Sequence, residues 1–119
     1  MIDNSARNLA VFLIRATANR SVTWTLENAP MHSIPSSPNQ VLIFLTTRYQ
    51  DQRIAIFESV SGYNHESDSR YRGIVTIAIM DESDRMLWRY DGVEPEFYEL
   101  LSDARRSLTV VDDFLRQFR

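Results

Sequence analysis

The sequence has 119 residues, of which 44% are hydrophobic and 24% charged, and its formal net charge at pH 7 is -3. This length and balance are typical of one globular domain and exclude a largely disordered chain, while the acidic net charge disfavours a nucleic-acid-binding protein. Cysteine and lysine are absent, which excludes disulfide bonds, thiolate chemistry and catalysis through a lysine Schiff base.

The first predicted element is a helix that begins near Asp3 or Asn4 and ends near Ala18. The side chains at its start can accept hydrogen bonds from free backbone amides. Apolar residues recur along it at helical spacing, which indicates one buried face. These residues are Leu9, Phe12, Leu13 and Ala16.

A strand is predicted from Val22 to Asn28, because apolar and polar side chains alternate along it. Its apolar side chains are those of Val22, Trp24 and Leu26. Residues 29–40 then read as a loop, since they contain three of the four prolines.

Four further strands follow with short connections, which indicates an antiparallel meander of five strands. A tight turn around Gln50 and Asp51 joins the first two of them into a hairpin. An acidic turn at residues 81–84 joins the last two. The four strands are predicted at Val41–Tyr49, Arg53–Tyr63, Arg70–Met80 and Arg85–Tyr90.

Two helices are predicted at the C-terminus. Pro95 suits the first turn of a helix, where its missing amide has no partner. The buried stripe of this helix comprises Phe97, Leu100, Leu101, Ala104 and Leu108. Thr109 and Asp112 resemble a capping box at the start of a short final helix. The apolar stripe of that final helix comprises Val111, Phe114, Leu115 and Phe118.

These elements predict a single α+β domain over residues 1–119, with an N-terminal helix, an antiparallel meander and one or two C-terminal helices packed on the sheet. The central strands are apolar on both faces, so both faces need a cover. We expect a second copy of the chain, or a constitutive partner, to cover the second face. The alternative is that the N-terminal helix lies on that side.

The candidate site residues are arginines of the predicted sheet. Arg70 and Arg72 share one face of their strand, and Arg48, Arg53 and Arg89 lie on neighbouring strands where they can flank this pair. Guanidinium groups that cluster in this way can bind a phosphate or an acidic protein surface. The alternative is that the arginines are scattered on the solvent side and pair with carboxylates.

Two other polar clusters carry weaker indications. His65, Glu66 and Asp68 contain the groups of a general base or metal site, but adjacent loop residues rarely converge on one ion, which favours a solvated loop. Residues 81–84 lack the length and the glycine of a calcium loop, which favours an acidic hairpin turn. The three glycines cannot form a phosphate-binding loop or a dinucleotide fingerprint. We therefore predict no cofactor, no metal and no catalytic residue.

The order of helix, tryptophan-bearing strand, meander and C-terminal helix resembles that of small uncharacterised bacterial α+β proteins. The stretches that carry this resemblance are Leu9–Trp24, Ile54–Val60, Ile74–Asp81 and Phe97–Phe118. The resemblance implies a fold but no activity and no functional residues. Small acidic dimeric chaperones of secretion systems, and immunity and antitoxin proteins, are also similar in size and acidity.

These features favour a cytoplasmic, non-catalytic protein-binding module that is homodimeric and uses a sheet face or the region of Arg70 and Arg72 as its contact surface. The start of the chain lacks the basic stretch of a secretory signal, and no apolar run approaches the length of a membrane span. We therefore expect no membrane partner. The alternative function is a small-ligand or phosphate-binding regulator that uses the arginine cluster.

Overall fold

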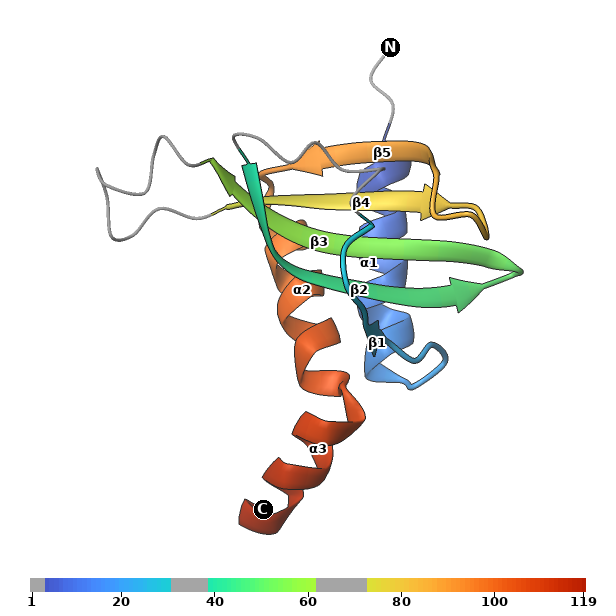
Figure 1. Cartoon of the computed structure of the whole chain (residues 1–119). Coiled ribbons are helices and arrows are strands. Elements are labelled where there is room, and N and C mark those ends of the chain that lie inside the picture. Colours follow the sequence, from blue (N-terminus) through green and yellow to red (C-terminus); the bar gives the residue numbers. More distant parts are fainter. Residues whose placement is uncertain (1–3, 31–38, 62–72) are drawn as a thin grey trace.

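The computed structural model describes residues 4–30, 39–61 and 73–119 of the chain. Within these residues, an N-terminal helix precedes a five-stranded antiparallel sheet in which each strand pairs with the next, and helical segments follow (Figure 1). The predicted α+β fold is thereby confirmed. The elements are α1 (Ser5–Ala18), β1 (Thr25–Leu26), β2 (Asn39–Tyr49), β3 (Gln52–Ser61), β4 (Ile74–Met80), β5 (Met86–Gly92), α2 (Pro95–Ser107), α3 (Thr109–Leu115) and the 3-10 helix η1 (Arg116–Phe118).

The hairpin of β2 and β3 has its tight turn at Gln50 and Asp51, as predicted. Both residues have a positive φ, of 51° and 65°, which is the backbone conformation of a two-residue type I′ turn. Tyr49 and Gln52, on either side of the turn, are register partners. Because this turn matches the right-handed twist of the strands, it holds β2 and β3 in register at the end of the sheet.

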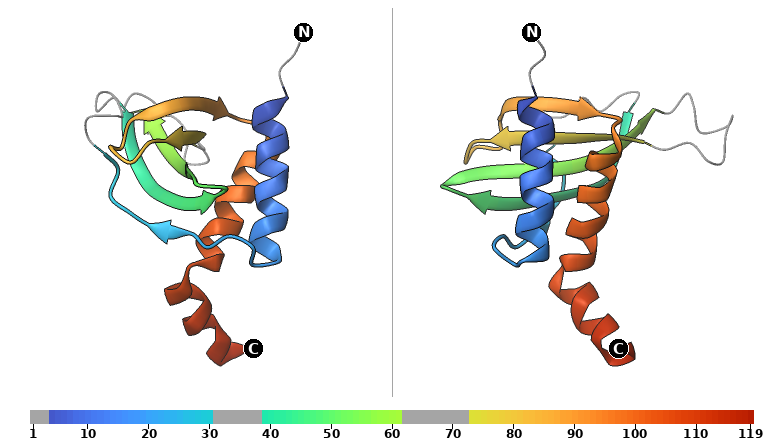
Figure 2. Two further views of the ribbon diagram at one scale, coloured as in Figure 1. Left: turned by 90° about the vertical axis from the view of Figure 1, so that its right-hand side faces the viewer. Right: turned by 180° about the vertical axis from the view of Figure 1, so that it is seen from behind.

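The main core lies between the sheet and two helices. Helices α1 and α2 lie side by side on the same face of the sheet, as both views of Figure 2 show. The fully buried side chains of this core include Leu13, Leu45, Ile56, Ile77 and Leu100. Each such side chain contributes roughly 1.5–3 kcal/mol of burial free energy. Since α1 shares its face with α2, the alternative in which the N-terminal helix covers the second face is wrong.

The second face of the sheet is buried within one chain. Its apolar side chains, Phe44, Ala55, Phe57, Ala78 and Met80, are at most 2% exposed. The rings of Phe44 and Phe57 stack at a centroid distance of 5.4 Å, and the guanidinium of Arg89 lies 5.9 Å from the Phe57 ring centre. Ala29, Val41 and Met86 pack against these side chains, and the strands curve along their length (left view of Figure 2). These apolar side chains are therefore already buried within one chain, and the homodimer stays a prediction.

Two apolar side chains are more exposed than the predicted stripes indicate. Phe12 in α1 is 38% exposed and packs beside the Tyr49 ring at 4.7 Å, because smaller residues of α1 face the core instead. Leu26 is 58% exposed in β1, which has only two residues and lies at the sheet edge. Trp24 is buried as expected, and its Nε1 donates to the Thr17 hydroxyl at 2.9 Å.

Helix α2 begins at Pro95. It buries Phe97, Leu100, Leu101 and Ala104 of the predicted stripe, whereas the fifth residue, Leu108, lies just after the helix and is half-buried. Gly92, the last residue of β5, lies directly beside the Phe97 ring. A Cβ atom at Gly92 would lie 2.5 Å from Cδ2 of Phe97, which is too close for any side chain. The glycine therefore permits β5 and α2 to pack closely together at this end of the core.

Candidate functional site

Helices α3 and η1 extend from the end of α2 away from the sheet (Figure 1). Helix α2 ends at Ser107, and the next residue, Leu108, has a φ of -58° and a ψ of 135°, which are extended rather than helical. Helix α3 restarts at Thr109 without a side-chain capping hydrogen bond. The capping box predicted from Thr109 and Asp112 is therefore wrong, because the N-cap position is Leu108 and the Thr109 hydroxyl lies one residue too late.

One side of α3 and η1 is apolar and exposed. We call Val110, Phe114, Leu115 and Phe118 the α3 apolar face; their exposed fractions are 74%, 59%, 38% and 72%. Val110, Phe114 and Phe118 are spaced four residues apart, which aligns them along one row of a helix, and the two phenylalanine rings are in contact at 5.4 Å. Neither α3 nor η1 contains a buried residue. Three residues of the predicted stripe, Phe114, Leu115 and Phe118, belong to this exposed face, whereas the fourth, Val111, is half-buried.

The other side of α3 carries paired charges. The Asp112 carboxylate accepts hydrogen bonds from Arg116 at 2.7 Å and from Arg119 at 3.3 Å, and Asp113 lies 3.9 Å from Arg116. The hydrogen bond from Arg116 lowers the pKa of the Asp112 carboxyl, and the same pair raises the pKa of Arg116. These pairs at helical spacing stabilise α3 although it lacks a core contact of its own.

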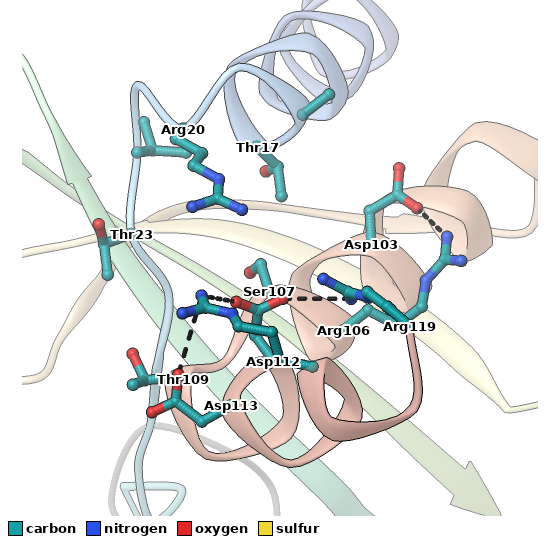
Figure 3. A pocket seen from close by; sticks show the side chains of 13 residues that line it. Thr17, Arg20, Thr23, Asp103, Arg106, Ser107, Thr109, Asp112, Asp113 and Arg119 are labelled. Atoms are coloured by element: carbon teal, nitrogen blue, oxygen red, sulfur yellow. Dashed lines mark hydrogen bonds and ion pairs between the residues drawn. The ribbon is translucent and has the colours of Figure 1, made fainter.

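A cleft of about 510 Å³ lies between the C-terminal end of α1 and the charged side of α3 (Figure 3). Arg20 reaches into it from the end of α1, and Asp112 and Asp113 line the opposite wall. The other arginines that line it, Arg106, Arg116 and Arg119, each pair with an aspartate. The lining holds four arginines against three aspartates, so most but not all of its positive charge is compensated within the cleft.

The predicted arginine cluster is only partly described by the structure. Arg48 and Arg53 are register partners on β2 and β3, so the sheet does bring them together. Arg48 donates to both carboxylate oxygens of Glu82 at 2.7 Å, and Arg89 donates to Asp91 at 2.8 Å. Each of these arginines is therefore already paired within the chain. Arg70 and Arg72 lie outside the described residues.

Arg53 is the most enclosed member of this set. Its side chain is 12% exposed and forms ion pairs with Glu27 at 2.9 Å and with Asp84. Partial burial lowers the pKa of Arg53, but the hydrogen bonds to Asp84 and Glu27 outweigh that effect and raise it above its ordinary value. A ligand anion would have to displace two carboxylates from this guanidinium, which argues against a phosphate site here.

The acidic residues between β4 and β5 form a structured turn. The Asp81 carboxylate accepts hydrogen bonds from the backbone amides of Ser83 at 2.8 Å and Arg85 at 2.9 Å. The hydrogen bond from the Arg85 amide lowers the pKa of the Asp81 carboxyl. The part of the chain that the structure describes contains no cluster of histidine and carboxylate side chains suited to a metal ion. His65, Glu66 and Asp68 lie outside that part.

Comparison of the chain with protein-family models, curated proteins and solved structures finds no match. The resemblance to small bacterial proteins therefore stays a prediction. None of the helices in the described residues is both long and apolar enough to cross a lipid bilayer. The α3 apolar face is the feature on which a function can be argued.

Proposed function

We propose that this protein is a non-catalytic protein-binding module and that the α3 apolar face is its contact surface. The observation that carries the proposal is the exposure of Phe114 and Phe118, at 59% and 72%, on a helix that has no buried residue. Burying a phenylalanine side chain of this size contributes roughly 1.5–3 kcal/mol, so a partner that covers both rings gains appreciable binding free energy.

The shape of the surface suits recognition of another protein. An amphipathic helix presents apolar anchors at intervals of three and four residues, and a groove or a second helix can receive them as one row. Aromatic side chains are enriched in the cores of protein interfaces because they bury a large area with few rotatable bonds. The charged residues on the opposite side keep α3 hydrated where a partner does not touch it.

The alternative function, a regulator that binds a phosphate or small anion through the arginine cluster, has less support. Arg48, Arg53 and Arg89 are paired with carboxylates of the same chain. A bound anion would compete with these carboxylates and would leave them unpaired. No other observation favours this alternative.

The test is capture of protein partners by the tagged full chain from extract of its native cells. We expect at least one stoichiometric protein to be retained by the wild-type chain and lost with the double variant Phe114→Ala/Phe118→Ala. Alanine is the best helix former, so this variant removes the rings and keeps α3.

The matched control is Leu87→Ala, because Leu87 is 63% exposed on β5, away from α3. This control should retain the same proteins as the wild-type chain. Equal retention by the double variant would contradict the proposal. A rise in melting temperature with inorganic phosphate, in the absence of any captured protein, would favour the anion-binding alternative instead.

A further inference from the structure

We infer that the cleft between α1 and α3 binds the carboxylate group of a small organic acid, with the Arg20 guanidinium as its cationic contact. The residues that line this cleft include none of the α3 apolar face, so the inference does not depend on the proposed function. The charge balance of the cleft, the backbone conformation of Arg20 and the hydroxyl groups on the cleft walls each support it.

One positive charge of the cleft lacks a compensating carboxylate. The lining contains four arginines and three aspartates. Arg106, Arg116 and Arg119 each pair with an aspartate of the lining. Arg20 forms no ion pair with any residue that the structure describes. The uncompensated charge is therefore that of Arg20, and an anion is the ligand that neutralises it.

The backbone holds the Arg20 side chain in a conformation that suits glycine better. Its φ of 64° lies in the left-handed region, which is unfavourable for a residue with a Cβ atom. The Arg20 amide donates to the Thr17 carbonyl at 3.3 Å. The next amide, of Ser21, donates to the Ala16 carbonyl at 2.8 Å, which completes a Schellman motif. Arginine thus replaces the usual glycine there, at a loss of stability, and its guanidinium points into the cleft (Figure 3).

Attraction to the negative end of the α1 dipole does not account for this choice of residue. A cation near the C-terminus of a helix is favourable without a left-handed backbone. Arg15 already provides such a cation in the last turn of α1. What Arg20 adds is a positive charge inside the cleft, which Arg15 does not line.

Hydroxyl groups on both walls can complete the binding of a carboxylate. Thr23 lies on the segment that follows α1, and Thr109 lies at the start of α3; both line the cleft (Figure 3). Neither hydroxyl has a hydrogen-bond partner among the described residues. A threonine hydroxyl can rotate to donate to an acceptor, and a carboxylate accepts several hydrogen bonds, so hydroxyl and guanidinium donors can share it.

The charge balance favours a carboxylate over a phosphate. A carboxylate carries one negative charge, which matches the single positive charge in surplus. A phosphate monoester carries about two charges at neutral pH, and Asp112 and Asp113 on the opposite wall would repel the second. The cleft volume of about 510 Å³ lies within the range of small-molecule sites, roughly 300–1,000 Å³, so an organic acid can enter it.

The first experiment is an NMR titration of the isotope-labelled full chain with sodium acetate at neutral pH and constant ionic strength. Acetate is the smallest stable probe with an alkyl carboxylate, and acetamide is its neutral counterpart. We expect acetate to shift the Arg20 side-chain signal and the amide signals of Ser21, Thr23 and Thr109, whereas acetamide should shift none of them. Because acetate makes few contacts, its dissociation constant should be millimolar or weaker.

The second experiment repeats the titration with variants of the cleft. Arg20→Gln should weaken acetate binding by about tenfold or more, because it removes the cationic contact. Asp113→Asn should strengthen binding by about twofold to fivefold, because it adds one positive charge to the surplus. Asp113 suits this test, since its side chain is 62% exposed and its contact with Arg116 is 3.9 Å long. The matched control is Arg15→Gln, which should bind acetate as the wild-type chain does.

A third variant, Arg20→Gly, separates binding from folding. Glycine adopts the left-handed conformation freely, so this variant should have a melting temperature about 2–5 °C higher than the wild-type chain. The same variant should lose the response to acetate. A loss of binding in a more stable protein cannot be attributed to unfolding.

The opposite results would overturn the inference. These are acetate shifts that persist in Arg20→Gln or Arg20→Gly, equal shifts with acetamide, or weaker binding in Asp113→Asn. Tighter binding of inorganic phosphate than of acetate at the same signals would also overturn the choice of a carboxylate. Each of these results leaves the proposed function standing, because capture of a protein partner is measured through Phe114 and Phe118.

Discussion

The second face of the sheet and the α3 apolar face each carry a pair of touching phenylalanines, yet only one pair is buried. Phe44 and Phe57 are each 1% exposed, whereas Phe114 and Phe118 are 59% and 72% exposed, and the ring centres of both pairs are 5.4 Å apart. The curved sheet supplies further neighbours for the first pair. Helix α3 projects from the body and supplies few for the second. An aromatic pair thus stabilises the fold only where other elements surround it, and elsewhere it is available for binding.

The largest expected effect separates the two pairs by their contribution to folding. Phe57→Ala should lower the free energy of unfolding by roughly 3–5 kcal/mol, because it leaves a cavity in a closely packed face. Phe114→Ala should change it by about 0.5 kcal/mol or less, as expected for an exposed side chain. Urea denaturation of both variants measures the difference. Equal losses in the two variants would mean that α3 is part of the core.

A smaller loss of stability is expected from a substitution at the contact between β5 and α2, which is another buried aromatic site. Gly92→Ala should destabilise the fold by about 1–3 kcal/mol, because its Cβ would overlap the buried Phe97 ring. Thermal unfolding measures the loss, and Phe97→Leu in the same background should recover part of it by making space. Full stability of Gly92→Ala alone would show that the ring can move aside.

The smallest expected effect is the loss of stability of α3 at low pH. The pKa of Asp112 is lowered from its ordinary value of 3.8, chiefly by the hydrogen bond from Arg116. Its contribution to the stability of α3 is therefore present above pH 3.8 and is lost as the pH falls through the lowered pKa. Carboxyl chemical shifts in an NMR titration should show Asp112 with a midpoint below 3.8, and a midpoint at or above that value would contradict the pairing.

Much of the fold could be predicted because its signals are local. Alternating side chains identify β2, β3 and β4, and the two residues between β2 and β3 identify the turn. The position of α1 could not be predicted in the same way. Apolar residues on both faces of a strand show that both faces are covered, but they do not show which segment covers them. Here neither α1 nor α2 covers the second face, and Ala29, Val41 and Met86 pack against its apolar side chains.

The candidate site shows the same limit. The spacing of Phe114, Leu115 and Phe118 identifies an amphipathic helix, but a buried stripe and an exposed one have the same period. The extended conformation at Leu108 directs α3 away from the sheet, and that conformation has no sequence signal as clear as a glycine or proline. The partners of Arg53 could not be predicted either. Glu27 and Asp84 are distant from Arg53 in the sequence, and only the pairing of the strands brings them close to it.

Amide hydrogen exchange of the full chain, compared between its free state and its associated state, tests most directly whether α3 rather than the sheet is the contact surface. The associated state is the complex with a captured protein. We predict that protection on association increases in residues 109–118 and stays unchanged in β2, β3 and β4. An increase confined to these strands, with α3 exchanging as freely as before, would contradict the account.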